Sequence, residues 1–324
     1  MWKRNLLVSK WLGLVLVFGF CVSVLSSYSE HSNSIHSDQT ITFTDALNRQ
    51  VTVPDNPERV AALIGSFADV WQLAGGEVCA APEDAWDDCG LELGDAVNLG
   101  GAHSPSLESL LSAEPDFVIA SSSTSSNVEM KEILENAGIP VAYFDVDCFE
   151  DYLAMLKVCT DITGRSDLYE KNGLHIKTQI EEIKTEVAEA DLSDRERRVL
   201  LLRASSGFVK AKGSQGTILG EMLNDLGCTN IADSDRLLLE TLSLESVIRQ
   251  EPYRIFVVTM GDDTKKAIKN FDRMMNENPA WGKLDAVKEK RLHVMDRRLF
   301  NIKPNAKWAE AYEKLSEILL EKSK

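Results

Sequence analysis

The chain has 324 residues and carries 51 acidic against 35 basic side chains, which gives a net charge of −16. A chain this acidic is poorly suited to bind nucleic acid or an anionic membrane surface, because both carry dense negative charge. Its length is enough for two lobes, each with a hydrophobic core of its own.

The first residues have the order of a secretory signal. Three basic residues precede the apolar run Trp11–Leu25, and a serine-rich stretch follows it. The run is shorter than the roughly 18 residues that a membrane span needs. We therefore expect residues 1–26 to be a signal peptide and residues 27–40 a flexible tether, with an uncleaved anchor as the alternative. The remainder has a net charge of −19. It is expected to work outside the cytoplasm, at the outer face of the cytoplasmic membrane or in the periplasm.

Cys21 ends the apolar run, as the lipid-carrying cysteine of a bacterial lipoprotein does. The bulky Phe20 stands before it, where those signals have a small residue. Lipidation of Cys21 and plain cleavage after Ser26 or Ser27 therefore stay open as alternatives.

Five further cysteines follow, and no two of them have the C-x-x-C spacing of a metal or redox site. Cys79 and Cys89 are close enough in sequence for one disulfide in an oxidising compartment. The alternative is that all five are small buried apolar residues.

The stretch from 41 to 150 alternates strands with helices. Residues 41–54 predict a hairpin, 59–64 a short buried strand, and 65–76 a helix that two glycines end. Residues 107–147 continue with helix, strand, helix and strand. This alternation predicts parallel βαβ units and therefore a first α/β lobe.

Strand signals stop between residues 151 and 192, where apolar side chains keep helical spacing. We expect a long rigid helical connector there, which would allow only small rocking motions of the lobes. Residues 193–324 resume the alternation and predict a second α/β lobe. The predicted fold is α/β, with two Rossmann-like lobes of short parallel sheets, a long connector helix, and a ligand cleft between the lobes.

Two copies of one segment stand 137 positions apart. The sequence "SLESLLSAEPDFVIA" runs from 106 to 120, and "SLESVIRQEPYRIFV" runs from 243 to 257. Six positions are identical, and two more differ only in apolar shape. A single repeat at this distance indicates two similar lobes rather than a solenoid.

Each copy predicts a short capped helix, a Glu-Pro stop and a buried strand. Ser106 and Ser243 suit the N-cap position. Glu108 and Glu245 fall in the first turn, where the helix dipole favours a negative charge. Aspartate would serve the dipole equally well, so a glutamate in both copies indicates a further role. Two carboxylates at matching places would suit two arginines on a symmetric partner.

Together these features resemble the substrate-binding proteins of ABC importers for iron chelates, haem and cobalamin. The likeness rests on "TDALNRQVTVPDNPERVAAL" at Thr44–Leu63 and on the repeated segment, where Ser106 replaces the family's asparagine. It extends from residue 41 to the C-terminus. It implies a monomer with no intrinsic cofactor, a metal chelate as the transported ligand, and an ABC permease dimer with its ATPase as partner. It also implies that Glu108 and Glu245 dock into arginine pockets of the permease.

In open α/β sheets, ligands bind beyond the carboxyl ends of the strands, which two facing lobes would place on a shared cleft. Arginines there would hold carboxylate or catecholate oxygens, and aromatic rings would stack on a planar chelate. The ligand-binding residues predicted on this ground are Ser66, Phe67, Trp86, His103, Arg203, Ser205, Phe208, Met260, Arg297, Arg298 and Phe300. For any single arginine, the alternative is a salt bridge to the abundant acids.

The arginines favour a ferric siderophore as the ligand, with haem or cobalamin as alternatives. In a haem complex, His103 and Met260 would be the axial ligands. We expect no catalytic residues, because no nucleophile elbow, phosphate loop or zinc-protease motif occurs. A chelatase-like enzyme on the same fold is the rival. Direct capture of bare zinc or manganese is disfavoured because only His103 is well placed, so we expect no metal site. A purely structural surface protein, with no ligand, is the last rival.

Overall fold

The computed structural model describes residues 40–261 and 263–321. The predicted signal peptide, Cys21 and almost all of the predicted tether lie outside these residues. Within the described part of the chain, no helix is both long and apolar enough to cross a membrane.

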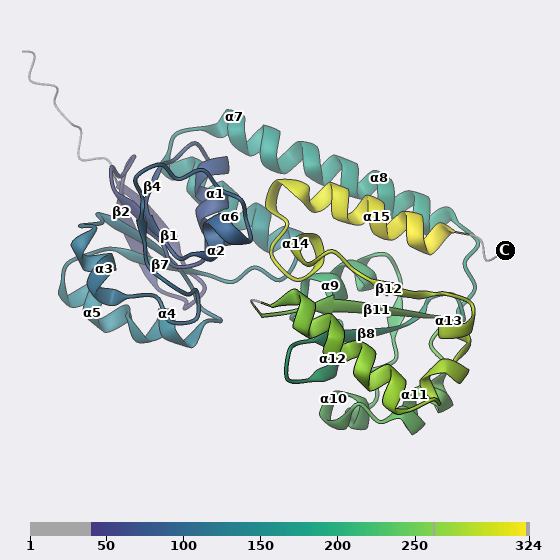
Figure 1. Cartoon of the computed structure of the whole chain (residues 1–324). Coiled ribbons are helices and arrows are strands. Elements are labelled where there is room, and N and C mark those ends of the chain that lie inside the picture. The colour runs from purple at the N-terminus through teal and green to yellow at the C-terminus, as the bar shows by residue number, and fades with distance from the viewer. Residues whose placement is uncertain (1–39, 262, 322–324) are drawn as a thin grey trace, which may run out of the picture. The chain divides into compact units, whose positions relative to one another are not determined.

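The first lobe is built on a five-stranded parallel sheet. Across the sheet the strands are β5 (Val97–Asn98), β4 (Val78–Ala81), β3 (Val60–Ala62), β6 (Phe117–Ser121) and β7 (Val141–Phe144). Helices α1 (Gly65–Leu73) and α6 (Phe149–Ile162) pack on one face. Helices α3 (Leu107–Ser112), α4 (Ser125–Glu129) and α5 (Lys131–Asn136) pack on the other (Figure 1). Both faces are covered, which explains why the central strands β3, β4, β6 and β7 are almost entirely apolar.

The second lobe repeats this plan. Its strands are, in order, β10 (Thr229–Asn230), β8 (Arg198–Ala204), β11 (Arg254–Thr259) and β12 (Leu292–Val294). One face carries α8 (His175–Glu189), α9 (Ile218–Asp225) and α15 (Trp308–Leu320). The other carries α10 (Arg236–Thr241), α11 (Leu244–Gln250), α12 (Thr264–Glu277) and α13 (Asp285–Lys288). Two α/β lobes are therefore confirmed.

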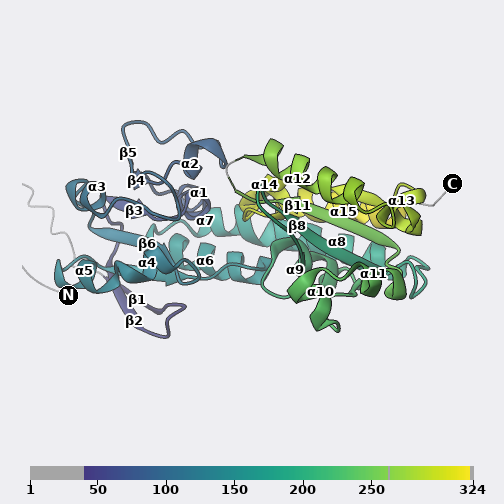
Figure 2. The ribbon, with the colours of Figure 1, turned by 60° about the horizontal axis from the view of Figure 1, so that its bottom comes forward.

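Two small antiparallel units accompany the parallel sheets. The predicted hairpin forms β1 (Thr40–Thr44) and β2 (Gln50–Pro54), which make a sheet of their own (Figure 2). The segment after β8 was expected to be a loop, but Val209–Lys212 forms β9, antiparallel to β8. The turn between them is made by Ser205, whose Oγ accepts hydrogen bonds from the backbone N–H groups of Gly207 and Phe208.

The region predicted as a helical connector holds two helical stretches, and the second contains the long connector helix. Helix α6 ends at Ile162, and Gly164 follows with a positive φ of +67°. The chain then continues through α7 (Ser166–Tyr169) and the π-helical turn Glu170–Leu174 into α8. Gly173 in that turn lies against α6, where an added Cβ would be 2.7 Å from Leu153 Cδ1. The connector is the second of these helical stretches, and α15 packs along it (Figure 1). The exact lobe boundaries stay a prediction.

A single apolar cluster runs through both lobes. It joins Phe117 of the first sheet to Val199 of the second by way of α6, α8 and α15. Trp308, at the start of α15, meets Phe149 of α6 edge to face, with ring centroids 6.0 Å apart. A shared, close-packed core resists shear, which supports the expectation of small motions between the lobes.

The sequence repeat is also a structural repeat. Val60 pairs with Phe117 in the first sheet, and Val199 pairs with Arg254 in the second. In both copies the N-cap serine accepts a hydrogen bond from the N–H three residues on, at 3.1 Å for Ser106 and 3.3 Å for Ser243.

An arginine at the start of the first parallel strand of each lobe completes the likeness: Arg59 directly precedes β3, and Arg198 is the first residue of β8. Arg59 donates to the carbonyls of Ala113 and Glu114 at the end of α3. Arg198 donates to the carbonyl of Gln250 at the end of α11. These carbonyls would otherwise lack partners, and they lie at the negative end of the helix dipole.

Both copies also end their helix in the left-handed region. Glu114 has a φ of +48° and Glu251 a φ of +45°, where glycine or asparagine is usual. The Glu-Pro stop predicted the end of each helix but not this conformation.

Replacing Glu114 and Glu251 by glycine is therefore expected to raise the free energy of unfolding by roughly 1 kcal/mol for each site. Removing the backbone strain of a left-handed non-glycine residue stabilises the folded state by about 1–3 kcal/mol. Glycine loses more conformational entropy on folding than other residues, which costs about 1 kcal/mol. Urea unfolding measures the change. Glu182→Gly, within the regular helix α8, should instead lower stability by about 1 kcal/mol. If the glycine variants at residues 114 and 251 were less stable than the unaltered protein, the idea that Glu114 and Glu251 are strained would be wrong.

Candidate functional site

The carboxyl ends of the two sheets face each other, and three pairs of groups meet across the boundary. Asp88, after β4, pairs with Arg297, after β12. Asp69, in the helix after β3, pairs with Arg298 at 2.9 Å. The third pair interacts through charge without a direct salt bridge: Asp147, after β7, faces Arg203 near the end of β8. The predicted cleft between the lobes therefore lies at the strand ends.

A cavity of about 370 Å³ lies on the boundary between the lobes, next to the carboxyl ends of β4 and β12. Asp87 and Asp88 of the first lobe line it together with the ends of β11 and β12 and the start of α12. Its remaining lining residues are Thr259, Thr264, Ile268, Val294, Met295, Asp296, Arg297, Arg298 and Ile302. Both lobes thus contribute polar side chains to one hollow, as a ligand site between lobes requires.

Arg297 and Arg298 line this cavity but are already paired. Arg297 donates to a carboxylate oxygen of Asp88, and Arg298 donates to Asp69 and to the backbone carbonyl of Lys303. In this structure both guanidinium groups therefore hold the lobes together. The salt bridge, raised above as the alternative for any single arginine, applies to these two.

Asp69 lies at the centre of the bridge. Asn305 donates at 2.8 Å to the same carboxylate oxygen and at 2.7 Å to the carbonyl of Ser66. Asn305 is fully buried with a φ of +55°. Burial raises the pKa of Asp69, against the lowering effects of Asn305 and Arg298. The carboxylate is thus held by two polar partners in a poorly solvated place.

A different set of cations, Arg203, Lys210, Lys212 and Lys303, forms what we call the cationic cluster. Arg203 on β8 lies directly opposite Lys210 on β9, and Lys212 is two residues further along β9. Among the described residues, no salt bridge involves any of the four. The buried Nε of Arg203 also lacks a hydrogen-bond partner there.

Burial dominates the electrostatics of the cationic cluster, and Asp147 is the acid that opposes it most. Burial lowers the pKa of Arg203, and Asp147 opposes this. Burial also lowers the pKa of Lys212, and the charges of Arg203 and Lys210 lower it further. For Lys303, burial lowers the pKa against the opposing effect of Asp147. A bound anion would favour the charged forms of Arg203, Lys212 and Lys303 and would accept charge-assisted hydrogen bonds from them.

The buried aromatic rings correct one part of the prediction. Phe67 and Phe300 were expected to stack on a ligand, but they are 0% and 2% exposed and belong to the core. Phe67 packs edge to face with Phe144 at 6.4 Å. Helical spacing on α1 turns Phe67 into the core, where Lys303 Nζ lies over its ring at 5.9 Å from the centroid. Ser66 is buried as well, and its carbonyl is held by Asn305.

The other predicted residues lie at the strand ends with differing exposure. Trp86 in α2 (Asp84–Asp87) is half-buried against the core. His103 and Phe208 are exposed, and Met260 is half-buried just after β11. Ser205 is used by the β8–β9 turn. Their contact with a ligand stays a prediction.

Sequence reasoning did not place Lys212 beside Arg203 and Lys210. The alternation in "VKAK", at Val209–Lys212, was the available signal, since it places Lys210 and Lys212 on one face of a strand. Treating the segment as a loop concealed that face.

Cys79 and Cys89 are free in the structure, so the possible disulfide does not form. Cys79 packs with the cluster under α3 and α5, whereas Cys89 lies near Arg298 and Asp69. Burial raises the pKa of the Cys89 thiol to about 12. Among the described residues, no three His, Cys, Asp or Glu side chains gather in a way that would hold a metal ion.

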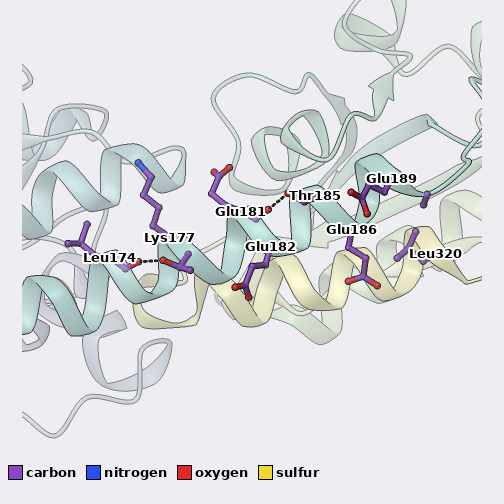
Figure 3. A pocket seen from close by; sticks show the side chains of 10 residues that line it. Leu174, Lys177, Glu181, Glu182, Thr185, Glu186, Glu189 and Leu320 are labelled. Carbon is purple, nitrogen blue, oxygen red and sulfur yellow. Dashed lines mark hydrogen bonds between the residues drawn. The ribbon is translucent and has the colours of Figure 1, made fainter.

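A larger hollow of about 990 Å³ lies along the outer face of α8, away from the strand ends (Figure 3). Four glutamates line it: Glu181, Glu182, Glu186 and Glu189. Lys177 is the single basic side chain in this lining. Such a surface would repel an anionic chelate, so the site at the strand ends is the better candidate.

The two glutamates singled out by the repeat are both exposed in the first turn of their helices, Glu108 in α3 and Glu245 in α11. They are therefore available to a partner.

Two α/β lobes that meet at their strand ends around a polar hollow define a solute-binding protein of the two-lobed type. A family model described as periplasmic binding protein matches residues 60–299. The chain belongs to this family. The resemblance to the substrate-binding proteins of ABC importers is thus confirmed.

Two curated relatives come from Bacillus subtilis. The ABC transporter substrate-binding lipoprotein YvrC is 23% identical over 279 residues, which cover 86% of this chain and 84% of that protein. The Fe(3+)-citrate-binding protein YfmC is 26% identical over 279 residues, which cover 84% of this chain and 80% of that protein. The first of these names describes a lipoprotein of an ABC transporter.

Among solved structures, SirA of Staphylococcus aureus, complexed with staphyloferrin B, has the same fold. The TM-score is 0.69 at 20% identity, and the match covers 88% of this chain and 100% of that one.

Proposed function

We propose that this protein captures an anionic ferric chelate of the siderophore type between its lobes and delivers it to an ABC permease dimer with its ATPase. The observation that carries the proposal is the cationic cluster, whose four side chains have no salt-bridge partner among the described residues. Ferric complexes of citrate-like and catecholate chelators present several negatively charged oxygens. The names of YfmC and SirA support the same ligand class.

Binding would join both lobes. The cationic cluster would hold the chelate's oxygens, while Trp86, His103, Phe208 and Met260 stand at neighbouring strand ends as candidate contacts. Arg297 and Arg298 would reach the ligand only by leaving their carboxylates. Asp145 and Asp147, next to the cationic cluster, would oppose a second negative charge and so favour chelates that place their anionic oxygens on one side.

Delivery would use the exposed Glu108 and Glu245, docked into arginine pockets of the permease. The free protein would be a monomer with no intrinsic cofactor and no catalytic role. A lipid on Cys21 would hold it at the membrane surface, and retention of the protein on membranes after Cys21→Ser would contradict that anchor.

Titration of the purified protein tests the ligand class. Ferric citrate, a ferric catecholate, haem and cobalamin are added in turn, and quenching of tryptophan fluorescence is followed. We expect saturable, stoichiometric binding of one of the anionic ferric chelates. Binding of haem or cobalamin alone would replace the siderophore assignment. Steady conversion of any complex would instead indicate a chelatase-like enzyme.

Replacing Arg203 or Lys303 by glutamine should weaken binding of that chelate by about tenfold or more. A hydrogen bond to a charged group is worth about 1.5–3 kcal/mol, and 1.4 kcal/mol corresponds to a factor of ten in Kd. Lys157→Gln, an exposed lysine on α6 paired with Asp161, is the matched control and should bind normally. Unchanged affinity in both variants would move the ligand away from the cationic cluster.

A further inference from the structure

The two repeat helices expose an apolar side chain at the same place. Leu111 on α3 is 36% exposed, and Ile248 on α11 is 44% exposed. They are 137 positions apart, so they are equivalent in the repeat. Each lies three residues after the exposed glutamate of its helix, which puts the carboxylate and the apolar group on one helix face. We call Glu108 with Leu111 the first docking face, and Glu245 with Ile248 the second.

The fold does not require these apolar groups. Leu110 and Val247, one residue earlier, are fully buried and anchor each helix to its sheet. Since this fixes the orientation of both helices, Leu111 and Ile248 must face outward. A polar residue would be less costly in water at either position.

We propose that Leu111 and Ile248 are contact residues for the permease, each pressed against an apolar surface that surrounds the basic side chain bound by the neighbouring glutamate. This rests on the proposed function. The occupant is one membrane permease with two equivalent subunits, because the two docking faces are near copies of each other. An apolar contact beside an ion pair excludes water and strengthens the electrostatic attraction.

The two docking faces differ in charge at one flanking position. Ser112 in the first copy corresponds to Arg249 in the second, a basic side chain four residues after Glu245. Arg249 lies 3.4 Å from the carboxylate of Asp235 and donates to Ser246 Oγ. These partners account for its charge, so Glu245 stays available to a basic group of the partner.

The two apolar groups differ in exposure, with Ile248 at 44% against 36% for Leu111. The second docking face therefore offers the more accessible apolar group, and its truncation should have the larger effect.

The test is the double variant Leu111→Ser with Ile248→Ser, expressed as the full chain in cells that lack the chromosomal copy. Uptake of radioactive iron, supplied as the chelate identified by titration, should fall about tenfold or more, while the Kd for that chelate stays unchanged. Leu174→Ser is the matched control, because Leu174 is 41% exposed in the π-helical turn before α8, outside both faces. It should transport normally.

Photo-crosslinking separates the possible occupants. A photoreactive amino acid at position 111 or 248 should cross-link to the same permease polypeptide in membranes. A cross-link to a second copy of this chain would overturn the proposal. Normal uptake by the serine variant, with uptake abolished in Glu108→Arg/Glu245→Arg, would refute the apolar contacts and leave docking by the glutamates intact. Normal uptake in both would refute docking by these faces altogether.

Discussion

Replacing Glu108 and Glu245 together by arginine is expected to abolish uptake while leaving ligand affinity unchanged. Both side chains are exposed on the first turns of α3 and α11, and neither belongs to the strand-end site. If they meet arginines of a permease, the change places like charges face to face, which costs several kcal/mol at each point. Cellular uptake and the Kd of the purified protein are the two measurements.

A matched pair on the connector helix controls for the change in net charge. Glu182→Arg with Glu186→Arg shifts the charge equally on the exposed face of α8. It should support normal uptake. The docking role fails if the Glu108/Glu245 variant transports as well as this control. Single variants should show partial loss, because one intact docking face still holds one subunit.

Removing the carboxylate of Asp69 is expected to lower the free energy of unfolding by about 3 kcal/mol. Asp69→Ala leaves the guanidinium of Arg298 and the amide of Asn305 without their shared acceptor at the lobe boundary. Breaking a buried pair costs about 3–5 kcal/mol. The lower end applies because the two charged side chains remain 16% and 19% exposed. Urea unfolding measures the change, and the melting temperature should fall by roughly 6 °C.

Asp69→Asn is the informative comparison. Because burial raises the pKa of Asp69, this carboxyl favours the folded state most when it is protonated, below its ordinary pKa. That contribution is lost as the pH rises through the folded-state pKa. A neutral amide keeps an acceptor oxygen for Asn305 and should therefore cost much less than alanine. Equal losses in the two variants would show that the bridge depends on charge rather than on hydrogen bonding.

Local chemistry made much of the fold predictable. The serine caps, the Glu-Pro stops and the apolar strands depend on neighbours a few residues away, and the repeat supplied each of them twice. The left-handed Glu114 and Glu251 were not predictable, because a residue before proline is known only to avoid the right-handed helix. Strand β9 was missed because four residues with one alternation are too short a signal.

The site was less accessible to sequence reasoning, because its partners are distant in the chain. Arg297 and Asp88 are 209 positions apart, and Arg298 and Asp69 are 229 apart. Whether an arginine is free or paired depends on how the lobes meet, which no local pattern records. The prediction grouped Arg203 with Arg297 and Arg298 and could not tell that, among the described residues, only the latter two form salt bridges. Nor could it foresee that Phe67 and Phe300 point into the core.

The packing of α15 determines when folding of the protein can be completed. Trp308 packs against Phe149, which lies more than 150 residues earlier in the chain. The core near α6 is therefore incompletely packed until α15 has been synthesised. We expect a ribosome-bound chain without this helix to be sensitive to proteases throughout. Passage through a narrow export channel requires a chain that is not yet folded. Folding would then be completed on the far side of the membrane.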